Sequence, residues 1–298
     1  MVVPDKTVTV VVLTHGRVRE VLKTVRRLRS LPEHPPIIVV DNGSADGTAD
    51  MLARRFPGIR IIALERNIGA AARNVGIREA KTPYVALCDD DTWWARGSLR
   101  CAAEVLEGYA RVAVVTGRVL VGRHGREDPT CRVMAHSPLT TDSPLPGPPV
   151  LGFMAGACMI RRLAFLNVGG FEPRFFLGGE EALVAVDLAS AGWQMVYVPE
   201  VLIHHYPSRT RDAPTRRRLL LRNALWFTWL RRPFSSVIRQ TGRLLRSGLR
   251  HPQEAMALFQ ALAGLPWIIR NRRCLPDPVE AALLTLDESP LFTPESQA

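Results

Sequence analysis

The N-terminal third of the chain alternates short apolar runs with helical stretches, and this alternation restricts the fold more than any other feature. The apolar runs lie at residues 7–13, 37–40, 59–64 and 84–88, and they have the length and β-branched character of buried strands. Residues 18–28 place apolar side chains at helical spacing with arginines between them. Strands that alternate with helices through short connections form parallel sheets with right-handed crossovers. The sequence therefore predicts an α/β fold with a mostly parallel sheet.

Length, charge and cysteine content narrow the class of protein. A chain of 298 residues holds one large α/β domain with an appendage, or two small domains. The formal net charge of +11 predicts an anionic partner such as nucleic acid, acidic lipid or a phosphorylated substrate. The five cysteines form no C-x-x-C pair, which is typical of a reduced cytosolic chain. The N-terminus lacks a signal-peptide pattern, and the apolar run 255–269 is too short to span a bilayer. We therefore expect a cytoplasmic protein.

Three adjacent carboxylates, Asp89, Asp90 and Asp91, follow the apolar run 84–88 directly. Adjacent negative charges repel one another, so their burial is costly unless a cation neutralises them. Hard oxygen ligands at the end of a strand suit Mg²⁺ or Mn²⁺, and open α/β sheets bind ligands at the carboxyl ends of their strands. The alternative is a solvated acidic turn before the helix that begins near Arg96. The motif by itself does not decide between the two.

Polar residues also follow the other predicted strands. Asp41 ends the second strand beside Thr14 at the end of the first, where a carboxylate can accept hydrogen bonds from a ribose hydroxyl or a base N–H. Asp-Asn-Gly-Ser is also ordinary turn chemistry. In Asn67-x-Gly69-x-x-x-Arg73, the glycine permits close backbone approach to a ligand, and a helix N-terminus there favours phosphate. Arg73 is a charged donor for a diphosphate; the alternative is a helix cap with a solvated arginine.

Two further pairs carry ionisable groups. Glu180-Glu181 follows two glycines at a predicted helix start, where paired acids are often only partners of the helix dipole. Near a phosphate site, such a carboxylate can instead deprotonate an attacking hydroxyl. His204-His205 follows a short strand predicted over 195–198, and an imidazole there can serve as a metal ligand. Each pair depends on its surroundings for a functional interpretation.

The C-terminal part of the chain differs in composition. Between residues 209 and 250 arginine dominates, and Asp212 is the only acidic residue. Arg239, Arg243 and Arg246 alternate there with apolar residues at helical spacing. Such a basic amphipathic pattern suits an anionic membrane surface. The alternative is a surface helix that packs on the rest of the protein and exposes its arginines.

Two segments show little periodicity. Residues 123–149 are rich in proline, and we interpret them as a mobile loop over a site, with a passive insertion as the alternative. The tail after Leu275 is acidic and interrupted by prolines. We therefore expect the tail to be loosely ordered.

Several of these motifs stand in a fixed order along the chain. They are Thr14, DNGSADGT (41–48), NIGAAARN (67–74), DDD (89–91), GACMIRR (156–162), FFLGGEE (175–181), GW (192–193) and VPEVLIHH (198–205). This ordered set resembles the family 2 glycosyltransferases with the GT-A fold, in particular bacterial rhamnosyltransferases. The resemblance implies a catalytic domain over residues 1–208, with a Rossmann-like, mostly parallel sheet flanked by helices, and a basic helical extension over residues 209–298.

The resemblance also implies a reaction and its participants. A sugar would move with inversion from a nucleotide-diphosphate donor to a hydroxyl acceptor on a cell-wall, lipid-linked or other glycan. Mg²⁺ or Mn²⁺ would be the cofactor, held by the D-x-D motif. The basic extension would favour peripheral association with the inner face of the plasma membrane. Nucleic acid is not an expected partner.

Specific roles follow from the matched motifs. The residues expected to bind the nucleotide-sugar are Thr14, Asp41, Asn67, Gly69, Arg73, Asp89, Asp90 and Gly156. Asp89, Asp91 and His205 are the expected metal ligands, with His204 as the alternative histidine. Glu181 matches the usual general base and Glu180 the acid that precedes it. Gly156 lies where the family places the acceptor-side wall of its site.

The sequence departs from the family in one place that bears on catalysis. The family commonly carries Glu-Asp-x-Asp, and here the segment reads Glu180-Glu181-Ala182-Leu183. Glu180 therefore remains a rival base, and a degenerate transferase that binds the donor without turnover is one alternative. A sugar-phosphate nucleotidyltransferase would need a longer Gly-rich loop after the first strand. A non-catalytic protein that binds nucleic acid or a nucleotide-sugar is the remaining alternative.

Overall fold

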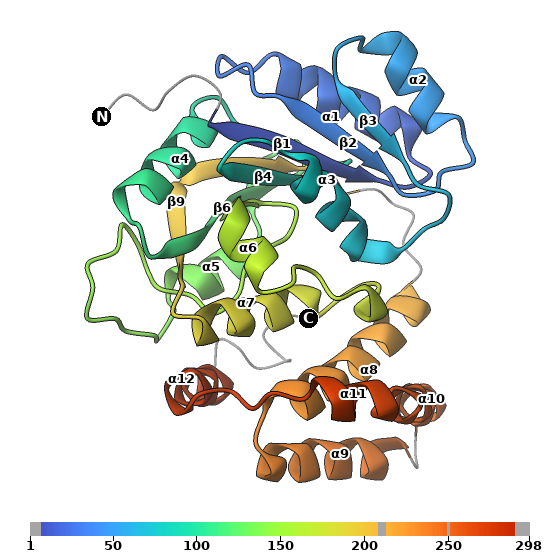
Figure 1. Cartoon of the computed structure of the whole chain (residues 1–298), viewed down its shortest axis with the longest axis vertical. Coiled ribbons are helices and arrows are strands. Elements are labelled where there is room, and N and C mark those ends of the chain that lie inside the picture. Colours follow the sequence, from blue (N-terminus) through green and yellow to red (C-terminus); the bar gives the residue numbers. More distant parts are fainter. Residues whose placement is uncertain (1–6, 208–212, 249–250, 290–298) are drawn as a thin grey trace.

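A single sheet forms the centre of the protein. The computed structural model describes residues 7–207, 213–248 and 251–289 (Figure 1). Over these residues the strand order is β3-β2-β1-β4-β8-β6-β9-β5, with β7 paired to β6. The strands are β1 (Val8–Thr14), β2 (Ile37–Asp41), β3 (Arg60–Ala63), β4 (Tyr84–Asp89), β5 (Thr92–Trp94), β6 (Val112–Val121), β7 (Arg126–Glu127), β8 (Cys158–Arg161) and β9 (Gln194–His205).

The four predicted N-terminal strands form the parallel half of the sheet. β1 pairs in parallel with β2 and β4, and β2 pairs with β3. Val10, Val11 and Val12 of β1 have no exposed surface. Successive side chains of a strand point to opposite faces, so both faces of this half are covered. The connecting helices are α1 (Val18–Arg29), α2 (Thr48–Arg55) and α3 (Arg73–Glu79), the last preceded by a 3₁₀ turn (Gly69–Ala72). The predicted α/β core is confirmed.

The other half of the sheet is mixed. β8 runs antiparallel to both β4 and β6, and β9 runs parallel to β6. The short strand predicted over 195–198 is longer in the structure, because β9 shifts register opposite Gly117 and Arg118 and then continues to pair. The end of β9 therefore reaches β5. The helices of this half are α4 (Ser98–Gly108), α5 (Pro129–Ala135), α6 (Arg162–Asn167) and α7 (Glu180–Ser190).

The Pro-rich segment 123–149 is more ordered than its composition predicts. It begins with β7, which pairs with β6, and it contains α5. Cys131 of α5 is buried, and its thiol accepts a hydrogen bond from Val119 N at 3.1 Å. At the other end, Tyr197 N donates to Pro148 O at 3.0 Å. The segment is thus fastened to β6 and β9 near its two ends and is not structureless.

The helices that follow β9 form a separate layer against α7 (Figure 1). They are α8 (Ala213–Arg231), α9 (Phe234–Gly248), α10 (Pro252–Ala263), α11 (Leu265–Asn271) and α12 (Asp277–Glu288). Phe175 and Leu183 pack with Trp226 and Trp229 of α8 in a hydrophobic cluster distinct from the main core. The expected domain boundary at residue 208 lies outside the described residues. In the described parts of the chain, no helix is long and apolar enough to span a membrane.

The predicted basic amphipathic helix is α9, but its apolar residues lie on two sides. Val237 and Leu244 pack into the cluster around α8. Phe234, Ile238 and Leu245 are instead 71%, 67% and 52% exposed. One side of the helix therefore packs on the protein, as the second alternative expects, while another side presents apolar groups to solvent.

The described part of the acidic tail forms a helix, α12, which contradicts the expectation of loose order there; residues 290–298 lie outside the described residues. Glu280 and Asp287 of α12 make salt bridges with Arg232 at 2.9 and 2.6 Å. Val279 is buried beside them. The partner of these acidic residues is Arg232, directly after the end of α8. The composition of the tail alone does not reveal this pairing.

Candidate active site

The expected site residues gather at the carboxyl ends of β1, β2 and β4. Parallel pairing sets Thr14 opposite Asp41 and Leu13 opposite Asp89. Asp41 is 2% exposed, and one of its oxygens accepts a hydrogen bond from Ser44 N at 3.1 Å. The strand ends that carry these polar groups therefore form one edge, where open α/β sheets bind ligands.

The middle carboxylate of the triple-aspartate motif, Asp90, faces the protein interior. It accepts hydrogen bonds from Thr14 Oγ1 and Arg17 Nη1, both at 3.0 Å, and its backbone carbonyl accepts one from Thr24 at 2.7 Å. Burial raises the pKa of Asp90 to about 7, although Arg17 opposes the shift. Asp90 is 4% exposed and organises Thr14 and Arg17, while its expected contact with the donor stays a prediction.

The first carboxylate of the motif, Asp89, faces the site. It forms a salt bridge with Arg73, and its side chain is 38% exposed. A Cβ atom at Gly156 would lie 2.5 Å from Asp89 Oδ2, so the carboxylate occupies the space that any side chain at position 156 would need. Arg73 and Gly156 thus fix Asp89 from two sides.

The antiparallel pairing of β5 with β9 brings one histidine to the acids. Thr92 lies opposite His205, and His205 Nε2 lies 3.6 Å from Asp91 Oδ1. His204 stacks on Trp93 with a ring-centroid distance of 5.4 Å, and burial lowers the pKa of His204. Neighbouring residues of a strand face opposite ways. Of the two histidines, His205 is therefore the one beside the acids.

The expected metal ligands are only partly assembled. Asp91 and His205 are neighbours, whereas the carboxylate of Asp89 is engaged by Arg73. Among the described residues, no three His, Cys, Asp or Glu side chains converge as a complete protein-only metal site requires. A cation at this edge would therefore need oxygen ligands from water or substrate.

Glu180 and Glu181 form the first turn of α7, near Arg73. Glu180 is 3% exposed and its Oε2 has no hydrogen-bond partner among the described residues, whereas Glu181 is half-buried. Burial raises the pKa of both carboxyl groups, and the charge of Arg73 opposes the rise. Burial also disfavours the Arg73 cation, but Asp89 and then the two glutamates raise the Arg73 pKa. Arg73 thus forms a salt bridge with Asp89 at the end of β4, and its positive charge also acts on the two carboxyl groups of α7.

Comparison with known protein families gives this geometry a context. The family model described as "Glycosyl transferase family 2" matches residues 9–169, more than half of the chain. The matched range includes Thr14, Asp41, Arg73 and Asp89. The chain belongs to glycosyl transferase family 2.

Two relatives from Mycobacterium tuberculosis illustrate what this glycosyltransferase is similar to. It is 28% identical over 211 residues to the N-acetylglucosaminyl-diphospho-decaprenol L-rhamnosyltransferase. This alignment covers 59% of the present chain and 68% of the relative. It is 32% identical over 221 residues to the pre-mycofactocin glycosyltransferase. This second alignment covers 70% of the present chain and 45% of that relative.

Solved structures of other glycosyltransferases share the fold. The mannosyltransferase PcManGT from Pyrobaculum calidifontis, in complex with GDP-Man and Mn²⁺, aligns over 97% of this chain and 83% of that chain, with a TM-score of 0.58 and 18% identity. TarS (residues 1–349) from S. aureus, in complex with UDP-GlcNAc, aligns over 93% of this chain and 83% of that chain, with a TM-score of 0.60 and 16% identity. At these identities the likeness shows the GT-A fold alone.

Gly69 and Asn67, which were expected to bind the nucleotide-sugar donor, both contact the protein's own backbone. Gly69 has φ +68°, and a side chain there would collide with the backbone of Phe176; Ala70 N donates to Phe176 O at 2.7 Å. Asn67 Oδ1 accepts hydrogen bonds from Gly69 N and from Asn42 Nδ2. A close backbone approach exists at Gly69, and its partner in the structure is the backbone of Phe176. A buried 3₁₀ turn stands where a phosphate-binding helix start was expected.

Sequence reasoning missed two residues that organise the site. Arg17 donates to Asp90 and lies 3.4 Å from Asp91. A basic residue at the start of a helix opposes the helix dipole, and this was an available signal. Asn223 of α8 donates to the carbonyls of Phe175, Leu177 and Gly178, just before the acids of α7. No local pattern could have revealed that long-range contact.

This chain has Leu183 where the family commonly carries the second aspartate of its Glu-Asp-x-Asp segment, and the structure shows what the leucine contacts. Leu183 stands at that position, is 5% exposed and packs in the cluster with Trp226 of α8. A charged side chain there would be buried among apolar groups at a high cost. In this chain the position serves the contact between α7 and the C-terminal helices.

Proposed function

We propose that this protein is an inverting glycosyltransferase that moves a sugar from a nucleotide-diphosphate donor to a hydroxyl group of a lipid-linked cell-wall glycan. The observation that carries this proposal is the gathering of Thr14, Asp41 and the Arg73–Asp89 salt bridge at the carboxyl ends of the parallel strands. The name of the rhamnosyltransferase relative specifies a diphospho-decaprenol glycan, and the structural neighbours hold GDP-Man and UDP-GlcNAc. Both support the proposed classes of donor and acceptor.

The donor fits the edge formed by β1, β2 and β4. Its nucleoside would lie against Thr14 and Asp41, where a carboxylate can accept hydrogen bonds from ribose or base. Its diphosphate would lie against Arg73. Arg73 forms a salt bridge with Asp89, whose side chain is 38% exposed, so its positive charge would attract a diphosphate bound at this edge.

Mg²⁺ or Mn²⁺ fits the residues at this edge. Asp91 and His205 supply a carboxylate and an imidazole within 3.6 Å of one another, and Asp89 is a further carboxylate of the D-x-D motif. Such cations bind through one or two carboxylates and complete their shells with water and substrate phosphates. When bound, the cation neutralises the charge that develops on the leaving diphosphate.

Glu181 is the proposed general base, because it is half-buried at the site while Glu180 is 3% exposed. The acceptor hydroxyl oxygen forms a bond to C1 of the sugar as the bond from C1 to the diphosphate oxygen breaks. The hydroxyl proton passes to Glu181, and the nucleoside diphosphate leaves with the bonding electrons. Arg73 stabilises the diphosphate charge. Attack from the face opposite the leaving group inverts C1.

Thermal unfolding with nucleotides tests the donor site directly. UDP, dTDP and GDP are each added with and without Mn²⁺ to the wild type and to Asp91→Ala. A ligand that binds only the folded state raises the melting temperature. We expect a metal-dependent rise with one nucleotide that is lost in Asp91→Ala. A folded wild type that responds to none of the three would refute the proposal.

We further propose that residues 1–208 act as the catalytic domain and that the C-terminal helices hold it at an anionic membrane. Exposed apolar residues gather on these helices: Phe234, Ile238 and Leu245 on α9, Phe259 on α10 and Ile269 on α11. The described part of α9 contains arginines and no acid. Apolar insertion combined with basic charge is the way monotopic helices bind anionic bilayers. Flotation with anionic vesicles should carry the protein upward at low salt, and a soluble Ile238→Glu/Phe259→Glu variant should remain at the bottom.

A further inference from the structure

A cavity of about 780 Å³ lies between the catalytic core and the C-terminal helices. Its wall includes Gly179 and Ala182, the residues that directly flank Glu180 and Glu181. The rest of the wall comes from α8, α9 and the end of α12. The turn that carries the proposed base is therefore part of this cavity's wall.

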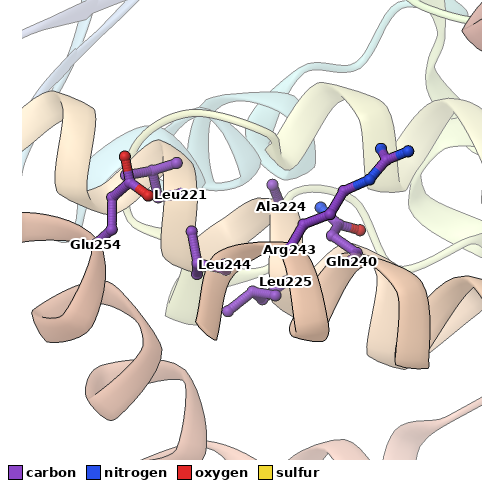
Figure 2. Close-up of a pocket in the computed structure, with 7 residues that line it drawn as sticks. All are labelled: Leu221, Ala224, Leu225, Gln240, Arg243, Leu244 and Glu254. Carbon is purple, nitrogen blue, oxygen red and sulfur yellow. The ribbon is translucent and has the colours of Figure 1, made fainter. Parts of the chain in front are cut away.

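The cavity continues along the groove between α8 and α9. A second pocket of about 220 Å³ shares Ala224, Gln240 and Arg243 with it. Figure 2 shows Leu221, Leu225 and Leu244 lining this second pocket, while the guanidinium of Arg243 extends away from them. We call the two connected spaces the α8–α9 groove.

The wall of the α8–α9 groove combines apolar and basic groups. Leu220, Phe227 and Leu284 supply apolar surface. Arg239 and Arg243 stand one turn apart on α9, and neither makes a salt bridge with a described residue. Unpaired arginines beside hydrocarbon surface suit a ligand with a phosphate group and an apolar chain.

The other charges in the groove do not cancel this preference. Arg232 is paired with Glu280 and Asp287, so Asp287 is already neutralised. The remaining acids of the groove are Glu288, at the end of α12, and Glu254, on α10 in the second pocket. Both lie outside α9, whose described part carries Arg239 and Arg243 and no acid. The α9 side of the groove is therefore positive.

We propose that the α8–α9 groove binds the phosphate-bearing lipid segment of the acceptor, with Arg239 and Arg243 on the phosphates and the apolar wall on the hydrocarbon chain. The inference rests on the proposed function, which it deepens by placing the acceptor's lipid. The sugar hydroxyl would reach Glu181 around the first turn of α7. The C-terminal helices would then select lipid-linked acceptors over free glycans.

Direct binding tests the groove without requiring turnover. Farnesyl diphosphate, inorganic diphosphate and farnesol are titrated into the full chain with the donor site saturated by nucleotide and Mn²⁺. We expect farnesyl diphosphate to bind more tightly than either fragment. Arg239→Glu and Arg243→Glu should each weaken it about tenfold or more, because each loses a charge-assisted contact. Arg246→Glu is the matched control, since it makes the same charge change on α9 outside the groove. We expect it to change binding less than about twofold.

Three outcomes would overturn the inference. If Arg246→Glu weakens farnesyl diphosphate binding as much as the groove variants do, the attraction is general and not specific to the groove. If inorganic diphosphate alone binds as tightly as farnesyl diphosphate, the apolar wall has no role. If farnesyl diphosphate does not bind, the site does not exist. Transfer assays give a separate reading: the groove variants should raise KM for a lipid-diphosphate acceptor without changing kcat or nucleotide affinity. A wild type that binds no nucleotide refutes the proposed function, while the lipid titration, carried out without nucleotide, still decides the groove.

Discussion

Asn223 donates a hydrogen bond from its side-chain amide to the backbone carbonyl of Gly178 at 2.6 Å. The same amide reaches the carbonyls of Phe175 and Leu177, and Asn223 has no exposed surface. Gly178 and Gly179 have φ values of +85° and +84° and lead directly into Glu180. An α8 side chain therefore holds the turn that sets the position of the acids.

Replacement of Asn223 should affect both stability and catalysis. Asn223→Leu keeps the approximate volume but removes the amide donor from the part-buried carbonyls of Leu177 and Gly178, which should lower the free energy of unfolding by about 1–3 kcal/mol. Displacement of Glu181 should lower kcat more than it changes nucleotide affinity. Chemical denaturation and steady-state kinetics measure the two effects. Asn271→Leu, which removes one exposed hydrogen bond to Trp267, is the control and should leave kcat unchanged.

The contact between Gly156 and Asp89 predicts a donor-site defect. Gly156→Ala places a methyl group 2.5 Å from Asp89 Oδ2, so the carboxylate must move away from Arg73. We expect weaker metal-dependent nucleotide binding, measured by calorimetry. At Gly152 an added Cβ meets nothing within 4 Å, so Gly152→Ala should bind nucleotide as the wild type does. Identical affinities for all three proteins would contradict the role of Asp89.

The proposed base predicts a pH dependence of the rate. Burial raises the pKa of Glu181 above its ordinary value of 4.5, and only the ionised carboxylate can accept a proton. The rate of transfer should therefore fall as the pH decreases through this raised pKa, at a higher pH than for an exposed glutamate. Glu181→Gln should lower kcat about 10²–10⁴-fold.

Glu180→Gln separates the roles of the two acids. Because Glu180 is almost fully buried, its replacement should leave the acidic limb of the pH profile in place. If Glu180→Gln abolishes the pH-dependent limb while Glu181→Gln retains it, the roles are reversed.

The two adjacent histidines should behave differently. His205→Ala removes the imidazole beside Asp91 and should reduce the Mn²⁺-dependent rise in melting temperature with nucleotide. His204→Ala removes the ring stacked on Trp93 and should lower stability by about 0.5–1.5 kcal/mol, with the Mn²⁺ response retained. Thermal unfolding measures both. Equal loss of the Mn²⁺ response in both variants would contradict a specific role for His205.

Much of the fold could be predicted because local patterns determine it. The buried runs that became β1, β2, β3 and β4 alternate with helices, and short connections leave a parallel sheet as the arrangement. The antiparallel β8 and the extension of β9 were not predictable in this way. Their pairing depends on distant strands and on a register shift at Gly117.

The sequence predicted which residues gather at the site better than it predicted what each side chain contacts there. The sequence by itself placed Asp41, Asp89 and their neighbours at strand ends, because strand length and the abrupt change from apolar to acidic residues are local properties. Only the tertiary structure decided that Asp90 turns inward to Thr14 and Arg17, and that His205 rather than His204 meets Asp91. It also decided that Asn223 holds the turn before Glu180. The physical reason is that pairing between distant segments, and the need to satisfy each buried polar group, determine where a side chain points.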